Sequence, residues 1–286
     1  MRYETPQSVE DAVGLLASGG AGARVLAGGT DLLVQLRSGI FEPELVVDIK
    51  QIDETRTVTS ENGGFRIGAA VAGAELSEHA DVPGVWPGVV EAFDLIGSVQ
   101  IQGRASMGGN LCNASPAGDS VPALIAAGAV CTIAGPGGTR ELAVEDVCTG
   151  PGKTSLASGE FIVSFFLPER PARSGDAYLR FIPRTEMDIA VVGAGVNVTL
   201  DEAGVITSAR VALGAVAPTA MLVEDCCNAL IGTTGDAAAM EALAAAASAA
   251  CNPINDKRGT IEYRTKVAGV IAVRAAKIAL ARAKGE

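Results

Sequence analysis

The sequence predicts an α+β protein with a small parallel sheet near the N-terminus and an antiparallel sheet with helices near the C-terminus. Within 24–49, a short apolar strand passes through a glycine-rich turn into a helix and then a second apolar strand, which is typical of parallel pairing. Glycine turns at 135–138 and at Gly204 separate apolar strands and indicate antiparallel pairing. The stretches 236–250, rich in alanine, and 263–283 favour long helices.

The first unit is expected to cover about residues 1–53. Ser8 and Asp11 fit a capping box, so the chain should enter a helix directly from its N-terminus and leave it at Gly19. The other elements expected here are a strand over 24–27, a helix that starts at Leu32 and a strand over 45–49.

The middle of the chain, residues 54–172, has a mixed pattern. Pro87 suits the first turn of a helix over 87–96, and Pro168 ends the last strand. Gly, Asn, Ser and Pro dominate 105–119, so we expect a long irregular loop there. The remaining expected elements are strands over 65–69, 130–134, 139–142 and 161–167 and a short helix over 121–127.

The main domain boundary is expected between Glu169 and Gly175, where the composition changes to Pro, Arg and Ser. A chain of 286 residues suits two domains that each bury a core. We expect an N-terminal domain over 1–172, with subdomains of about 1–53 and 54–172, and a C-terminal domain over 173–286. Strands over 190–200 and 206–213 and the two long helices belong to the second domain.

Composition limits the classes of partner. Hydrophobic residues make up 48% and charged residues 19%, which is typical of a globular chain. The 22 basic and 33 acidic residues give a net charge of −11 with no basic run, so neither nucleic acid nor anionic membrane is an expected partner. No apolar run approaches the length of a membrane span, and no signal core opens the chain; we therefore expect a cytoplasmic protein without membrane insertion.

The metal-ligating residues are few and scattered. Six cysteines form no C-x-x-C pair, and His79 is the single histidine, so we expect buried reduced thiols and no zinc or iron–sulfur site of this chain's own. Two nucleotide motifs also fail. Gly152-Lys153-Thr154 resembles the end of a P-loop but has Val147 where glycine is required, and Gly193-Ala-Gly195 continues to Val198 as a strand.

Two glycine-rich segments form the candidate binding site. In 26–31, a strand runs into Gly28, Gly29 and a helix, so backbone N–H groups can converge on an anion such as a pyrophosphate. Such a turn also uses glycine for geometry alone. The segment 105–120 collects glycines, amides, hydroxyls and a carboxylate before a helix, and a loop of this length without function is uncommon. We therefore expect these loops to bind a ligand.

Together these segments resemble the FAD-binding signatures of the medium subunits of molybdenum hydroxylases, the xanthine dehydrogenase and carbon monoxide dehydrogenase family. The resemblance covers essentially the whole chain, in order. The segments that carry it are Ala27–Leu33, Ser106–Leu111, Asn113–Asp119, Gly150–Thr154, Arg180 with Arg184, Asp188–Ala190 and Tyr263-Arg264.

The resemblance implies a two-part FAD-binding domain of the PCMH type, with both loops around the diphosphate and the flavin towards the C-terminal domain. Asp119 would bond the adenosine ribose, and Ile162 and Arg180 would approach the cofactor. The implied cofactor-binding residues are Leu26, Ala27, Gly28, Gly29, Thr30, Asp31, Leu32, Ala105, Ser106, Gly108, Gly109, Asn110, Cys112, Asn113, Asp119, Ile162 and Arg180. No catalytic residue and no metal ligand is implied.

Three positions depart from the family pattern. Ser106-Met107 stands where the family often has Thr-Ile, which keeps a hydroxyl and apolar bulk. Gln102-Gly103 replaces a common Arg-Asn pair. Thr30-Asp31 replaces the His-Ser or Gln-Ser of carbon monoxide dehydrogenases, which argues against carbon monoxide as the substrate.

The function implied by the resemblance is electron transfer. FAD on this chain would take electrons from [2Fe–2S] clusters on a small subunit, while a large molybdopterin subunit oxidises the substrate, and would pass them to an acceptor such as NAD or a quinone. A dimer of heterotrimers is expected. Two alternatives stay open: a free-standing flavoenzyme, which should carry its own substrate acids and bases, and a scaffold without cofactor, which should have broken glycine loops.

Overall fold

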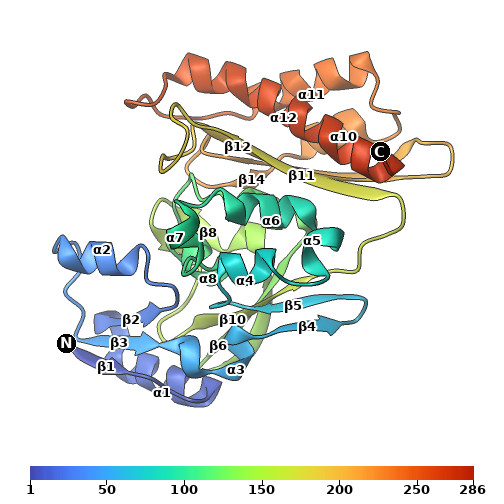
Figure 1. The fold of residues 1–286 in the computed structure, drawn as a ribbon. Helices are drawn as coiled ribbons and strands as arrows, with labels where there is room; N and C mark the ends of the chain where they lie inside the picture. Colours follow the sequence, from blue (N-terminus) through green and yellow to red (C-terminus); the bar gives the residue numbers. More distant parts are fainter.

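Three larger β-sheets and one two-stranded sheet organise the chain in the computed structural model, which describes residues 1–286 (Figure 1). A three-stranded parallel sheet lies near the N-terminus, a five-stranded antiparallel sheet follows, and a four-stranded antiparallel sheet belongs to the C-terminal part. The predicted α+β class is confirmed.

The parallel sheet has the strand order β1-β3-β2. Its elements are β1 (Arg2–Glu4), α1 (Val9–Gly19), β2 (Ala23–Leu26), α2 (Leu32–Arg37), β3 (Leu45–Asp48) and α3 (Asp53–Arg56). Ser8 caps α1 as predicted, accepting a hydrogen bond from the Asp11 N–H at 3.1 Å. The prediction that the chain enters this helix directly was wrong. Strand β1 comes first, and because its residues are polar or exposed, only its pairing with β3 defines it.

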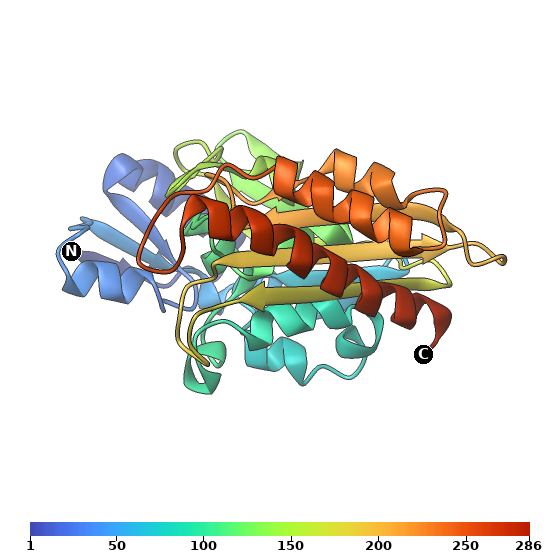
Figure 2. The same ribbon diagram turned by 90° about the horizontal axis from the view of Figure 1, so that it is seen from above.

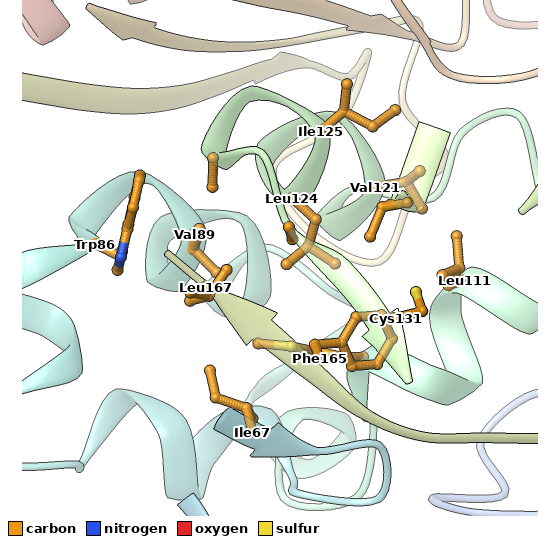
Figure 3. Close-up of a cluster of buried hydrophobic side chains, with 14 of the residues drawn as sticks. Ile67, Trp86, Val89, Leu111, Val121, Leu124, Ile125, Cys131, Phe165 and Leu167 are labelled. Atoms are coloured by element: carbon orange, nitrogen blue, oxygen red, sulfur yellow. The ribbon is translucent and has the colours of Figure 1, made fainter. Parts of the chain in front are cut away.

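The antiparallel sheet has the order β4-β5-β10-β6-β7. Its strands are β4 (Val58–Glu61), β5 (Gly64–Gly68), β6 (Val130–Gly135), β7 (Gly138–Ala143) and β10 (Phe161–Leu167), with β8 (Cys148–Gly150) and β9 (Lys153–Thr154) as a separate small ribbon. The helices of this region are α4 (Gly73–Ser77), α5 (Val82–Val85), α6 (Pro87–Asp94), α7 (Val99–Gln102), α8 (Met107–Cys112) and α9 (Ser120–Ala127). Their apolar side chains pack on the sheet in one buried cluster, which includes Phe165, Leu124 and Val121 (Figure 3).

The predicted irregular loop over 105–119 was wrong for its first half, because 107–112 form helix α8. Ser106 caps this helix by accepting a hydrogen bond from the Gly109 N–H at 3.2 Å. The two glycines lower helix propensity, but Gly108 packs directly on Ala69, so that tertiary contact outweighs propensity.

The C-terminal sheet has the order β11-β12-β13-β14 and is covered by helices on both faces. Its elements are β11 (Ser174–Phe181), β12 (Val192–Leu200), β13 (Ile206–Gly214), β14 (Met221–Leu222), α10 (Glu224–Leu230), α11 (Ala237–Ala249) and α12 (Ile261–Lys284). Helices α11 and α12 lie across the outer face (Figure 2). Helices α6 and α9 pack against the inner face, so they are shared between the C-terminal sheet and the middle of the chain.

Two properties of the whole molecule bear on its possible sites. No helix combines the length and the apolar character needed to cross a bilayer. No group of three or more His, Cys, Asp or Glu side chains is placed to hold a metal ion.

Candidate functional site

A cleft of about 550 Å³ lies where the N-terminal unit meets the middle of the chain. This volume is in the range of sites for small molecules and cofactors. Most of the predicted residues line it: Ala27, Gly28, Gly29, Thr30, Asp31, Leu32, Ala105, Ser106, Gly108, Gly109, Asn110, Cys112, Asn113 and Ile162.

The first glycine loop follows β2 and touches the second loop directly. A Cβ on Gly28 would lie 1.8 Å from the Arg104 carbonyl oxygen, so only glycine permits this approach. Gly29 has a φ of 80°, which also favours glycine. Gly29, Thr30 and Asp31 line the cleft, and their N–H groups donate no hydrogen bond within the protein. They are therefore free to bind an anion.

Lys50 supports the first loop through a hydrogen bond to its backbone. Its ammonium group donates hydrogen bonds to the Ala27 carbonyl at 2.9 Å and to the Asp48 carboxylate at 2.7 Å. Asp48 also accepts a hydrogen bond from the Tyr3 hydroxyl. Although burial alone would raise the pKa of Asp48, these hydrogen bonds and the charge of Lys50 lower it overall, so the carboxylate stays ionised and the loop support is maintained.

The second loop supplies side-chain donors from helix α8 and the residue after it. Asn110 Oδ1 accepts hydrogen bonds from the Ser120 hydroxyl at 2.7 Å and from its N–H at 3.3 Å. Asn113 Oδ1 accepts one from Gln35 at 3.1 Å, which joins α2 to this loop. The amide nitrogens of Asn110 and Asn113 donate no hydrogen bond within the protein and are available to a ligand in the cleft.

The charged groups of the cleft are largely compensated. Glu160 forms two hydrogen bonds of 2.8 Å with Arg140, which hold the pKa of Glu160 below its usual value. Burial raises the pKa of the Asp31 carboxyl. Arg24 is the one cationic side chain that lines the cleft. Such a cleft can accept a diphosphate in spite of the chain's negative net charge.

Cys112 lies open on the cleft wall at the end of α8. The surrounding protein raises the pKa of its thiol to about 12, so it remains a neutral thiol near pH 7.

Three predicted residues do not line the cleft. Leu26 is buried in the core. Asp119 accepts hydrogen bonds from the Tyr178 hydroxyl at 2.8 Å and from Arg180 at 2.7 Å, so it links α9 to β11 of the C-terminal sheet. In this geometry Asp119 and Arg180 bind each other behind the second loop. Their contact with a cofactor stays a prediction.

Asp119 should make stability depend on pH. Burial raises its pKa to about 6, although Arg180 and Tyr178 act in the opposite direction. Because the folded chain binds this proton more tightly than the unfolded chain does, the stabilisation present below about pH 4 is lost as the pH rises through about 6. Asparagine does not titrate, so Asp119→Asn should not lose this stabilisation. As the pH rises from about 4 to about 6, its unfolding free energy should therefore increase by roughly 1–3 kcal/mol relative to that of wild type, measured by urea denaturation.

Glu160→Gln is the matched control for that measurement. The pKa of Glu160 is lowered in the folded chain, so wild type should gain stability over this variant as the pH rises. If the stabilities of both variants changed in the same direction with pH relative to wild type, the raised pKa of Asp119 would be contradicted.

Sequence reasoning missed several residues of the cleft. They are Arg24, Val25, Gln35, Ile40, Phe41, Ile49, Ala69, Ile96, Gly152, Leu156, Glu160 and Phe161. Gln35 lies one turn after the first loop, and Phe161 lies next to Ile162, so proximity in sequence was an available signal for these two. No local pattern marks Phe41 or Leu156.

Comparison with known proteins adds to this geometry. The family described as "FAD binding domain in molybdopterin dehydrogenase" matches residues 1–170, and that described as "CO dehydrogenase flavoprotein C-terminal domain" matches residues 177–279. The carbon monoxide dehydrogenase medium chain of Afipia carboxidovorans is 35% identical over 283 residues, which cover 99% of this chain and 97% of the relative. The xanthine dehydrogenase FAD-binding subunit of Escherichia coli O157:H7 is 35% identical over 219 residues, 76% of this chain and 74% of the relative.

Solved structures show the same fold. A chain of carbon monoxide dehydrogenase from Hydrogenophaga pseudoflava superposes with a TM-score of 0.94 at 34% identity, covering 99% of this chain and 98% of that chain. A chain of quinoline 2-oxidoreductase from Pseudomonas putida 86 superposes with a TM-score of 0.90 at 25% identity, with the same coverage.

Proposed function

We propose that this chain, which belongs to the family of FAD-binding subunits of molybdopterin dehydrogenases, passes electrons from iron–sulfur clusters on a partner to an acceptor such as NAD or a quinone. The chain is a subunit of an oxidoreductase. The observation that carries the proposal is the direct contact of two glycine loops that line one cleft with residues whose N–H and amide groups donate no hydrogen bond within the protein.

The residues present fit FAD. The N–H groups of Gly29, Thr30 and Asp31 would hold the diphosphate, and the amides of Asn110 and Asn113 would bind further polar groups of the cofactor. Bound flavin would supply the redox chemistry, because it exchanges electrons singly or in pairs. The chain itself would bind and orient the cofactor, with the flavin ring placed to receive electrons from the partner.

Partners are proposed on chemical grounds. The chain holds no cluster of metal ligands, so substrate oxidation at molybdenum and electron relay through [2Fe–2S] clusters would take place on other chains. A relative in Paenarthrobacter nicotinovorans, 31% identical over 282 residues, is named as a subunit of the 6-hydroxypseudooxynicotine dehydrogenase complex. We propose a large molybdopterin subunit, a small cluster subunit, assembly as a dimer of heterotrimers and a cytoplasmic location.

A native tagged preparation tests this function. Mass spectrometry and metal analysis should find both partner subunits with molybdenum and iron, and acid should release noncovalent FAD into the supernatant. The isolated chain should not hydroxylate an organic substrate, because the proposed molybdenum centre for that step lies on a partner subunit. A stable FAD-loaded monomer that oxidises a substrate without molybdenum or iron would instead identify a free-standing flavoenzyme.

A further inference from the structure

Helix α2 presents its apolar residues to solvent. Four of its six residues are apolar, yet none of the six is buried, although the apolar stripe of a surface helix normally faces a core. Leu33 is 53% and Val34 63% exposed, and Ile40 and Phe41, which follow the helix, are 64% and 36% exposed. Figure 1 shows α2 at the edge of the molecule, outside the parallel sheet. Such a surface is typical of a contact with another molecule.

A further exposed apolar residue lies close to the other wall of the cleft. Ile40 and Phe41 line the wall that the N-terminal unit contributes, and Ile96 lines the cleft from the middle of the chain. Val99, three residues after Ile96 at the start of α7, is 74% exposed. Exposed apolar side chains thus lie beside the cleft on two sides. We define the apolar rim as Leu33, Val34, Ile40, Phe41 and Val99.

The α2 side of the apolar rim carries little charge. Arg37 is the only charged residue among 32–41, in a chain of which charged residues make up 19%. Depletion of charge around apolar residues, with arginine as the retained cation, is typical of the centre of a protein–protein interface.

A small ligand inside the cleft does not cover this surface. Leu33, Val34 and Val99 do not line the cleft. Leu33 instead lies against the first glycine loop, since a Cβ on Gly29 would be 3.2 Å from Leu33 Cδ1. The apolar rim therefore extends outside the cleft while contacting its loop, so a protein chain is the molecule that fits it.

Electron transfer selects which protein chain this is. The chain has no cluster of metal ligands, so the electrons must reach a cofactor in the cleft from another chain. Electron transfer weakens steeply with distance, and the donor must therefore sit against the edge of the cleft, close to the reactive atoms of the cofactor. Two copies of this chain paired symmetrically through the apolar rim would turn their clefts towards each other and leave the donor no approach.

We infer that the apolar rim is the docking surface for the electron-donating subunit, the proposed [2Fe–2S] protein. The inference rests on the proposed function and adds the place at which the donor binds. The facing surface of that subunit should be apolar, with a carboxylate opposite Arg37.

The first test places a charge in the apolar rim. Val34→Glu should weaken binding of the purified [2Fe–2S] subunit to the full chain by at least about ten-fold, followed by native mass spectrometry during dilution of the complex. FAD content should stay unchanged, because Val34 does not line the cleft, and glutamate is at least as good a helix former as valine. Val99→Glu should act in the same direction.

Val270→Glu is the matched control. Val270 is a 43% exposed valine of helix α12, on the outer face of the C-terminal domain. The variant should bind the [2Fe–2S] subunit as wild type does. Equal loss of binding in Val270→Glu and Val34→Glu, or full binding in both, would overturn the docking surface.

Photo-crosslinking identifies the occupant directly. The amino acid p-benzoylphenylalanine at position 34 of the chain in the native complex should crosslink to the [2Fe–2S] subunit. A crosslink to the large molybdopterin subunit, or to a second copy of this chain, would show that the occupant is a different one. A wild-type preparation that contains FAD but no [2Fe–2S] subunit would refute the proposed function itself, which separates that failure from failure of the docking surface.

Discussion

Gly28→Ala is expected to abolish FAD retention by the chain. The new Cβ would lie 1.8 Å from the Arg104 carbonyl oxygen and 2.6 Å from the Arg104 carbonyl carbon, both of them backbone atoms. Relief of that overlap requires the two glycine loops to separate, so the donors on either side of the cleft no longer face the same ligand. We expect FAD affinity to fall by more than about a hundred-fold, measured by flavin titration.

Gly14→Ala is the control for this prediction. Gly14 is an exposed residue inside α1 of the same unit, and nothing lies within 4 Å of the position of its Cβ. Alanine should stabilise the helix by about 0.5–1 kcal/mol and leave FAD binding unchanged. Normal FAD occupancy in Gly28→Ala would mean that the contact between the loops is not needed for binding.

Gly195→Val is expected to disrupt the contact between the C-terminal sheet and helix α9. A Cβ on Gly195 would lie 2.4 Å from the Pro122 carbonyl oxygen and 3.0 Å from Ala123 Cα. Since these are backbone atoms, α9 itself must shift, and the cost should reach about 3 kcal/mol of unfolding free energy, the upper end for overpacking.

The same variant should weaken FAD binding by several-fold. Helix α9 carries Ser120, which holds Asn110 in the second loop, so displacement of the helix reaches the cleft. Denaturant titration and flavin titration measure the two effects. Gly137→Ala, at an exposed position with open space around its Cβ, should change neither. A Gly195→Val chain of wild-type stability with weakened FAD binding would contradict this mechanism.

The sequence by itself determined the elements with a strong local signal. Apolar runs bounded by glycine or proline identified strands such as β10, which ends before Pro168, and side-chain capping identified the start of α1 at Ser8. The two glycine loops were also recognisable, because 26–31 and the longer segment 105–120 occur together and resemble the FAD-binding signatures of one family. These features depend on interactions between residues close in the chain.

Tertiary structure alone decided how the loops form a site. The approach of Gly28 to Arg104 joins residues far apart in the chain, and no local pattern encodes it. Pairing with β3 made β1 a strand, and packing of Gly108 on Ala69 made α8 a helix. Asp119 turned towards Tyr178 and Arg180, because a buried carboxylate needs donors that only the C-terminal sheet provides. Long-range packing and burial thus decided what each predicted residue contacts.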